Sequence, residues 1–389
     1  MGIGVIASKN VNNISDYYVG GKKLNYWIAA LSARSTGESG WLLLGVTGMG
    51  AVMGLSAFWI VLGEVIGVFL SWHFMAAKFK NLTDSYNSIT IPDFLHSHFN
   101  AKTNTIRIIA ATALSAFVVI YVSAQIDITG KTFESFLGYN YYNGIFIGFG
   151  IVVAYIFSGG FLAVAWSDIF QGSLMFVALL ILPIVAYFQL PTDTNFLQGL
   201  RDIDPSLLNI WGDGGFNLLN AFSVIGLLSI GIGFLGSPQV YVRFIAIRDS
   251  AEIKKGKIVA VLYTLITSSS AVIIGMLGRF MFTTSNQNPE LVLGVAGENV
   301  LYLLLIDIMP NVIVGFYIAA LLSAVMSTVD SLLVVASSAV TRDFYQQIIN
   351  PKADSQLLIN LSKKVTLALA FFALFVAISV SILSPNRTI

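Results

Sequence analysis

The sequence contains no cysteine and very little charge. Only 11% of its 389 residues are Asp, Glu, Lys or Arg, whereas soluble domains usually carry about a quarter. The lack of cysteine excludes disulfides, zinc–thiolate sites and thiol catalysis within this sequence. Of the three histidines, His96 and His98 lie in a polar segment, which favours a surface position over a metal site. A net charge of +1 gives no reason to expect a nucleic-acid partner.

Apolar residues dominate instead, at 56% of the chain, with a mean hydropathy of +0.80. A membrane-spanning helix needs about 20 mainly apolar residues. The segments that satisfy this are 25–49, 51–77, 104–128, 143–160, 166–188, 217–242, 257–282, 312–340 and 362–384. A shorter stretch, 291–309, is typical of an interfacial or re-entrant helix, and residues 3–8 read as the end of a truncated leading helix. The sequence thus predicts an all-α, multi-pass protein of the cell membrane, embedded in the lipid bilayer as one domain over residues 1–389.

Lysine and arginine are distributed unevenly over the predicted loops. If the loop after residues 3–8 is cytoplasmic, 16 of the 21 basic residues face the cytoplasm, Arg243 among them, and four face outside. Cytoplasmic loops are enriched in Lys and Arg, so this bias supports both the orientation and the number of spans.

Two spans are interrupted by glycine and polar residues near their middles. The first contains STGESG (35–40), and the sixth contains SIGIGFLGSP (229–238), whose Pro238 cannot donate a backbone hydrogen bond. Free backbone groups at membrane depth are tolerated where they line a cavity or pack against protein. Interruptions at matching places in two halves mark the binding site of transporters built from inverted repeats. Close helix packing through small residues is the alternative.

The span 312–340 carries a cluster of oxygen-bearing side chains. Its members are Ser323, Ser327, Thr328, Asp330 and Ser331. Hydroxyl and carbonyl oxygens are ligands for hard cations, although serines also bond back to their own helix. The aspartate favours a functional interpretation, because a carboxylate in lipid requires a cation, a proton or a partner.

Four further polar residues fall inside or at the edge of predicted spans. Asp168 stands near the start of 166–188, where helix capping and a functional role are equally consistent with the pattern. Glu64 lies well within the second span, and a carboxylate at that position makes it a candidate for solute binding. Tyr121 and Gln125 in the third span are weaker candidates.

Five stretches resemble signatures of the sodium:solute symporters, and most closely of their sodium/proline branch. They are SDYYVGGKKL (15–24), SGWLLLG (39–45), GGFLAVAWSDIFQ (159–171), GSPQVYVRFIAI (236–247) and AALLSAVMSTVDSLLVVASSAVTRDFY (319–345). The resemblance implies a leucine-transporter-like fold of two inverted five-helix repeats after one leading helix. The repeats would occupy about 25–190 and 217–389. The second would be incomplete and 1–10 a stub, in a chain that reads as truncated at both ends.

The resemblance also implies sites, carried over by position. A sodium site would use the backbone carbonyls of Ser35, Glu38 and Ala324 and the hydroxyls of Ser327 and Thr328. A second cation site, present in some members, would involve Asp168, Asp330 and Ser331. The solute would contact Ser39, Gly40, Trp41, Tyr121, Phe234 and Pro238, and we add Glu64 to this set from its position in the second span.

The sequence departs from the proline branch near these sites. That branch has an aspartate at the position of Gly37, and here an acid follows one residue later, at Glu38. A shift of one residue turns a side chain by about 100° around a helix, so Glu38 does not replace that aspartate. Arg34 and Glu38 are spaced i, i+4, which predicts an ion pair across one helical turn.

The remaining departures concern the solute and the second cation. Ile230 and Phe234 stand where the proline branch has tryptophan and tyrosine, and Asp330 stands where it has serine. We therefore expect a sodium-coupled importer working by alternating access, whose solute is proline, another amino or organic acid, a vitamin-like carboxylate or a sugar.

Three alternatives to sodium-coupled import stay open from the sequence. They are a proton-coupled or facilitative carrier that uses Asp330 or Glu64, a membrane sensor without transport, and an inactive fragment. An enzyme is disfavoured, because the sequence has no zinc motif and Asp168 and Asp330 lack the flanking signatures of aspartyl proteases. No obligate protein partner is indicated.

Overall fold

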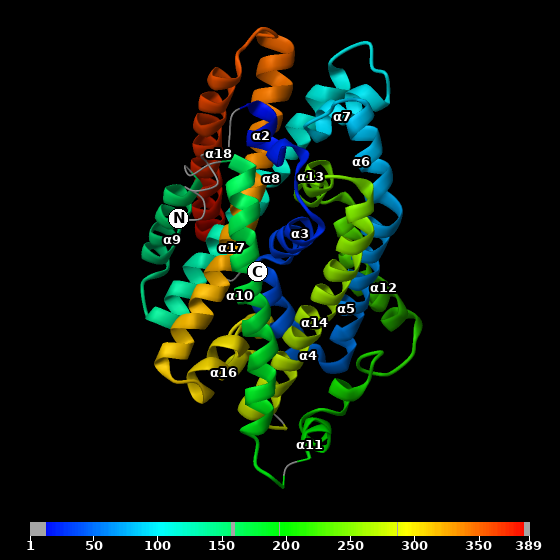
Figure 1. Cartoon of the computed structure of the whole chain (residues 1–389). Coiled ribbons are helices and arrows are strands. Elements are labelled where there is room, and N and C mark those ends of the chain that lie inside the picture. Colours follow the sequence, from blue (N-terminus) through cyan, green and yellow to red (C-terminus); the bar gives the residue numbers. More distant parts are fainter. Residues whose placement is uncertain (1–12, 157–159, 194, 286, 385–389) are drawn as a thin grey trace.

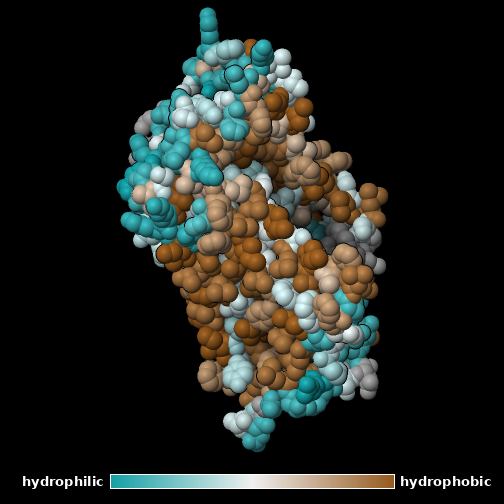
Figure 2. Space-filling model, turned by 90° about the vertical axis from the view of Figure 1, so that its right-hand side faces the viewer, coloured by the Kyte–Doolittle hydropathy of each residue, from teal (hydrophilic) through white to brown (hydrophobic). Residues whose placement is uncertain are grey.

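The computed structural model describes residues 13–156, 160–193, 195–285 and 287–384, and this part of the chain is almost entirely helical. Its long helices form an elongated bundle (Figure 1). Within the described residues, seven helical stretches are long and apolar enough to cross a membrane. An apolar belt separates two polar ends on the face in Figure 2. These features confirm the prediction of an all-α, multi-pass membrane protein.

The first half of the bundle contains the following helices: α2 (Ile14–Val19), α3 (Tyr26–Trp41), α4 (Thr47–Met53), α5 (Phe58–Leu70), α6 (Ala76–Ser85), α7 (Ile91–His98), α8 (Thr105–Leu137), α9 (Tyr141–Ile156) and α10 (Gly160–Phe188). Single π-helical segments join α3 to α4 and α5 to α6. The chain reverses between α4 and α5 at Gly54, whose φ of 57° suits glycine.

The second half contains α11 (Phe196–Ile203), α12 (Leu218–Ile232), α13 (Pro238–Ala246), α14 (Ser250–Phe282), α15 (Glu290–Leu293), α16 (Val300–Ile308), α17 (Asn311–Ser338) and α18 (Ser355–Leu383). A π-helix, Ala339–Ile349, extends α17. The stretch predicted as interfacial or re-entrant forms the short helices α15 and α16. With α11, α16 lies at the end of the bundle opposite α7 (Figure 1).

Both predicted helix breaks are present. In α3 the helical backbone is interrupted at Ser39, with φ 47° and ψ −179°. A positive φ at a residue other than glycine costs about 1–3 kcal/mol, so the surrounding packing must hold it in place. Between α12 and α13 a 3₁₀ turn over Gly233–Gly236 leads to Ser237 in an extended conformation, and Pro238 then starts α13. Proline suits this position, because the first helical residue needs no N–H donor.

Close packing through glycine also occurs, and it holds α12 against α5. A Cβ atom placed on Gly231 would lie 1.8 Å from the carbonyl oxygen of Gly63, and one on Gly67 would lie 1.9 Å from the carbonyl oxygen of Gly231. A Cβ on Gly233 or Gly236 would meet nothing within 4 Å. The glycines of the sixth span therefore have two different roles. Gly231 permits the close contact between α12 and α5, and Gly233 and Gly236 lie in the break.

Buried ion pairs tie together the end of the bundle that carries α7. Arg107 at the start of α8 bonds to Asp343 at 3.1 Å and to Asp93 of α7 at 3.0 Å. Thr90, the N-cap of α7, donates to the other oxygen of Asp343 at 2.8 Å. Arg107 lies on the predicted cytoplasmic side but is only 4% exposed. Its charge therefore joins α8 to α7 and to the π-helix that carries Asp343, in addition to contributing to the Lys/Arg bias used to orient the chain in the membrane.

Candidate functional site

A cavity of about 1410 Å³ lies beside both helix breaks. Its walls come from α3, α5, α6, α7, α8, α12, α13 and α17. Six of the seven residues predicted to contact the solute line it: Ser39, Trp41, Glu64, Tyr121, Phe234 and Pro238. Gly40 is not among the lining residues, because it is packed against Ile128 and Val325. The side chains predicted from two distant parts of the sequence thus meet around one space.

The cavity extends from the breaks toward the end of the bundle that the Lys/Arg bias assigns to the cytoplasm. Its lining there includes Lys78 and Leu82 on α6 and Leu95 on α7. At the opposite end, Lys131 on α8 pairs with Glu298, between α15 and α16, at 2.9 Å. The cavity thus reaches toward the end of the bundle that carries α6 and α7, and the ion pair joins elements at the opposite end.

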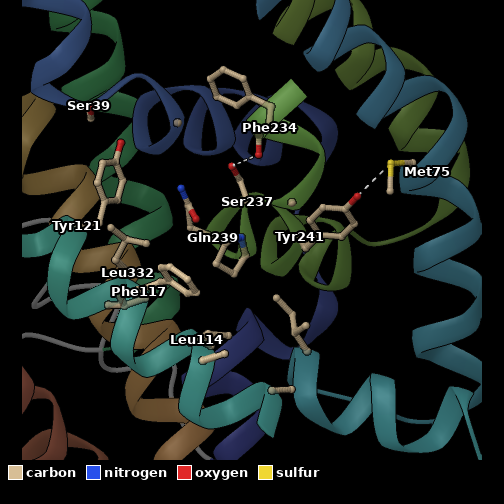
Figure 3. A pocket seen from close by; sticks show the side chains of 18 of the residues that line it. Ser39, Met75, Leu114, Phe117, Tyr121, Phe234, Ser237, Gln239, Tyr241 and Leu332 are labelled. Atoms are coloured by element: carbon tan, nitrogen blue, oxygen red, sulfur yellow. Dashed lines mark hydrogen bonds between the residues drawn. The ribbon is translucent and has the colours of Figure 1, made fainter. Parts of the chain in front are cut away.

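Polar side chains in the cavity come from both breaks and from α8 (Figure 3). The hydroxyl of Tyr121 points toward Ser39, and the amide of Gln239 lies between Tyr121 and Ser237. Glu64, 3% exposed, accepts a hydrogen bond from Ser268 of α14. The cavity therefore combines a mostly apolar wall with a few convergent polar groups, which is the usual composition of a small-molecule site.

The second half of the broken α3 begins with its first amides already bonded. The N–H of Gly40 donates to Oε1 of Gln125 on α8 at 3.2 Å, and the N–H of Trp41 donates to Oγ of Ser39 at 3.2 Å. Gln125, a weaker candidate from the sequence, thus supports the break from the neighbouring helix. Ser39 acts as the N-cap of the half-helix that follows it.

The oxygen atoms predicted to bind sodium meet where α3 crosses α17. Oγ of Ser327 lies 2.9 Å from the carbonyl oxygen of Ser35 and 3.1 Å from that of Ala324. Oγ1 of Thr328 lies 3.1 Å from the carbonyl oxygen of Thr36 and 3.0 Å from that of Ala324. Four of the five predicted groups therefore lie together, and the carbonyl of Thr36, which the sequence did not single out, joins them.

Glu38 is the fifth predicted residue, and its groups are engaged differently. Its carbonyl accepts the N–H of Leu42. Its carboxylate pairs with Arg34 at 2.6 Å and accepts from Thr267 of α14 at 2.9 Å, which confirms the predicted i, i+4 pair. The Arg34 guanidinium also lies 4.8 Å from the ring centre of Phe234, a wall of the cavity. The ion pair therefore lies directly behind this wall of the cavity.

Asp168 lies in the interior of a helix, not at its start. Because α10 begins at Gly160, the capping interpretation is wrong. One carboxylate oxygen, Oδ2, accepts from Arg243 at 2.9 Å and from Ser32 at 2.6 Å. Arg243 is fully buried, so its assignment to the cytoplasmic surface is also wrong: the helix α13 carries it into the bundle. Asp168 thus has a partner that the sequence did not indicate.

Unpartnered carboxylate oxygens lie next to this pair. Oδ1 of Asp168 and both carboxylate oxygens of Asp330 are buried and have no hydrogen-bond partner among the described residues. Asp330 lies close enough to Asp168 for the two carboxyl groups to interact electrostatically. Ser331 is 2.5 Å from the same guanidinium nitrogen of Arg243 that holds Asp168. The three residues predicted for a second cation therefore lie in one buried region, in which Asp330 and one oxygen of Asp168 lack a hydrogen-bond partner among the described residues.

Comparison with known proteins gives a consistent result along the whole chain. A model of the sodium:solute symporter family matches residues 17–383. The high-affinity proline transporter PutP of Bacillus subtilis is 35% identical over 96% of this chain and 77% of its own length. The osmoregulated proline transporter OpuE of the same organism is 32% identical over 100% and 76%. The sodium/proline symporter of Escherichia coli is 31% identical over 96% and 74%.

Solved structures share the fold. A Na⁺-coupled sialic acid symporter in a substrate-bound, outward-open state superimposes with a TM-score of 0.81 at 22% identity, over 98% of this chain and 80% of that one. The nucleobase-cation-symport-1 transporter Mhp1, in a closed conformation, gives 0.57 at 11% identity, over 94% and 74%. These likenesses confirm the leucine-transporter-like fold expected from the sequence.

Proposed function

This chain belongs to the sodium:solute symporter family, and we propose that the solute it carries with sodium is proline or a close amino-acid analogue. It is a multi-pass membrane transporter that couples the movement of a solute to sodium, not an enzyme. The observation that supports a solute-binding site between the helix breaks is the cavity that lies beside both of them. The choice of solute is supported by the relatives reported above, which are named as proline transporters or sodium/proline symporters.

In this proposal the solute lies between the breaks, against α8. Glu64 supplies a negative charge for the ammonium or imino nitrogen, and the hydroxyl of Tyr121 supplies a polar contact. Ile230 and Phe234 form the apolar wall for a small ring. The cavity far exceeds one such solute, because it also includes the path toward α6 and α7 along which release would occur.

We place the sodium ion at the crossing of α3 and α17. Its ligands would be the carbonyl oxygens of Ser35 and Ala324 and the hydroxyl oxygens of Ser327 and Thr328, completed by a carbonyl at Thr36 or Glu38. Oxygen atoms of this kind suit a hard cation. Because ligands from both helices meet here, sodium would stabilise one position of the broken α3 against α17. Solute and sodium would then favour the same conformation, and each would raise the affinity for the other by the same factor.

We further propose that Asp168, Asp330 and Ser331 hold a second cation. The supporting observation is the three buried carboxylate oxygens that have no donor within the described part of the chain, since a buried charge is costly unless it is paired or coordinates a cation. Arg243 satisfies only the other oxygen of Asp168. A second cation would make the sodium dependence of uptake steeper than that of a single site.

The sodium site is tested by Ser327→Ala combined with Thr328→Ala in proteoliposomes that take up labelled proline. We expect the sodium concentration for half-maximal uptake to rise at least about tenfold, because two ligands are lost. Ser337→Ala is the matched control: this serine is equally buried on the same helix, and among the described residues its hydroxyl donates only to the carbonyl of Val334. Unchanged sodium affinity in the double variant would refute the assigned site.

The solute and the second cation have separate readouts in the same vesicles. Sodium-driven uptake of another solute, with no uptake of proline, would refute the proposed solute and leave the sodium site standing. Asp330→Asn should reduce a steep sodium dependence to that of one site. A wild-type protein that already follows a single-site curve would contradict the second cation.

A further inference from the structure

The helices α5 and α14 pack side by side and together form an apolar surface on the outside of the bundle (Figure 1). They run in opposite directions, because Ser268 of α14 bonds to Glu64 of α5, and Lys257 of α14 meets His73 just beyond the end of α5. Residues spaced i, i+4 and i+7 share one side of a helix. Each helix exposes such an apolar stripe, made of Leu62, Ile66 and Phe69 on α5 and of Ile258, Leu262 and Leu265 on α14.

A basic cluster, defined as His73, Lys254, Lys255 and Lys257, lies at one end of the two stripes. Nζ of Lys257 is 3.0 Å from Nδ1 of His73 and 5.5 Å from the ring centre of Phe69. The His73 ring stacks on the same phenyl ring, with centres 5.0 Å apart and planes 11° apart. The two basic side chains and the last ring of the α5 stripe are thus in direct contact, across the groove between the helices.

The contact between Lys257 and His73 leaves donors for a further partner. An ammonium group has three N–H donors and no acceptor, so Lys257 donates to Nδ1, and the proton of the neutral imidazole lies on Nε2. Two N–H groups of Lys257 and the Nε2–H of His73 are not used by this bond. Phosphate oxygens are suitable acceptors for such donors.

The basic cluster is not neutralised by acidic side chains. Among the described residues, no carboxylate lies within ion-pairing distance of Lys254 or Lys257. The acids that precede them in the chain, Asp249 and Glu252, pair with Arg248 at 3.4 Å and 2.9 Å. Lys254 is exposed and lies one turn before Ile258, so it continues the α14 stripe as a positive charge.

Aromatic side chains indicate the depth of the basic cluster in the membrane. The ring centre of Tyr26, at the start of α3, lies 5.7 Å from Nζ of Lys255. Trp27 and Phe74, the neighbours of Tyr26 and His73 in the chain, are exposed. Tryptophan and tyrosine are enriched at the level of the lipid headgroups. The stripes therefore face the acyl chains, and the basic cluster lies at headgroup level, on the side that the Lys/Arg bias assigns to the cytoplasm.

We propose that the groove between α5 and α14 binds an anionic phospholipid, with the lipid phosphate on Lys257 and His73 and the acyl chains along the two apolar stripes. Lys254 adds a second positive charge for an anionic headgroup. A lipid fits better than a free phosphate, because the donors open onto a surface that acyl chains cover. Such a lipid would hold α5, which carries Glu64, against α14. The inference does not depend on which solute is carried.

The test is a lipid titration of the purified protein in a neutral detergent, followed by its unfolding temperature. The lipids are dioleoyl phosphatidylglycerol and dioleoyl phosphatidylcholine, which share their chains and differ in headgroup charge. We expect the wild type to be stabilised at a lower mole fraction of phosphatidylglycerol than of phosphatidylcholine. Glycerol phosphate, which has the anionic group without chains, should have no effect at the same concentrations.

The double variant His73→Gln and Lys257→Gln removes the proposed phosphate contacts. The mole fraction of phosphatidylglycerol for half-maximal stabilisation should rise at least about fivefold, because one lysine charge near a membrane surface contributes about that factor, and the response to phosphatidylcholine should not change. A wild-type unfolding temperature without added lipid verifies that the variant is folded. If it is not folded, the exposed Lys254→Gln should by itself give a rise of about fivefold.

The matched control is Lys364→Gln. Lys364 is an exposed lysine on α18, which the Lys/Arg bias assigns to the same side of the membrane. Its substitution should leave the phosphatidylglycerol titration unchanged, whereas an equal shift would mean a general attraction by basic residues and would overturn the site. Equal responses of the wild type to both lipids, or an unchanged titration in the folded double variant, would also overturn it. Stabilisation by glycerol phosphate alone would identify a soluble anion as the ligand and refute the lipid.

Discussion

The packing of α12 against α5 predicts a large effect from a single methyl group. In Gly231→Ala the new Cβ would lie 1.8 Å from the carbonyl oxygen and 1.9 Å from the carbonyl carbon of Gly63, and 2.4 Å from the backbone nitrogen of Glu64. All three are backbone atoms of a helix, so no side chain can rotate away. Ordinary contacts begin at 3.4 Å, so the two helices would have to separate by about 1.6 Å.

The size of the effect follows from known costs of overpacking, which are about 1–3 kcal/mol and sometimes more. Because backbone opposes backbone, we expect a value near 3 kcal/mol. In a chain of this size that corresponds to a fall of roughly 4 °C in unfolding temperature. Glu64 follows Gly63 directly and would be displaced from the cavity, so the concentration of solute for half-maximal uptake should also rise.

The assay is thermal unfolding in detergent followed by tryptophan fluorescence, together with uptake in proteoliposomes. Gly226→Ala is the control on the same helix, because a Cβ there would meet nothing within 4 Å. That control should be neutral, or stabilising by up to about 1 kcal/mol from the gain in helix propensity. If Gly231→Ala unfolds at the wild-type temperature, the helices are not held as closely as described and the reasoning fails.

Three further predictions concern charge and sodium. Glu38→Gln leaves Arg34 buried without its ion-pair partner, so the free energy of unfolding, measured by thermal unfolding, should fall by about 3–5 kcal/mol. Adding Arg34→Gln should recover much of that loss. A double variant as unstable as Glu38→Gln alone would contradict the pair. Lys131→Ala removes an ion pair at the outer end, so the cavity should become more accessible from outside. The measurement is the rate at which a reagent added outside labels a cysteine introduced into the cavity. Glu298→Ala should have the same effect, and opposite effects of the two variants would refute the role of this pair in closing the cavity. Sodium at about a hundred times its dissociation constant should stabilise the wild type by about 2.7 kcal/mol, and stabilisation by choline to the same degree would exclude a sodium-specific effect.

Features determined within one or two helical turns could be predicted from the sequence. The spacing of Arg34 and Glu38 predicted their pair, and Pro238 with its glycines predicted the second break. The interruption near residue 39 was also predicted, although its positive φ falls on Ser39 and not on a glycine. Such signals are local, because the chemistry of a few adjacent residues decides them.

Partners that come from distant segments could not be predicted. Arg243 bonds to Asp168 across 75 positions, and nothing in either segment specifies the other. The predicted sixth span ended at residue 242, one residue before Arg243, so this arginine was counted as a loop cation. Extending the helix to Ala246 would have placed a charged residue inside a span. Such a residue indicates a buried partner or a functional role, because an isolated charge in the membrane is costly.

The hydroxyl groups of Ser327 and Thr328 have a consequence for the unloaded carrier. In the structure they join α17 to the carbonyls of Ser35 and Thr36 on α3. At the proposed sodium site the same oxygens would coordinate the ion through their lone pairs, and each hydrogen would turn away from the ion. On release of the ion, the two hydroxyls would turn back to these carbonyls, so hydrogen bonds between α3 and α17 would replace the lost coordination.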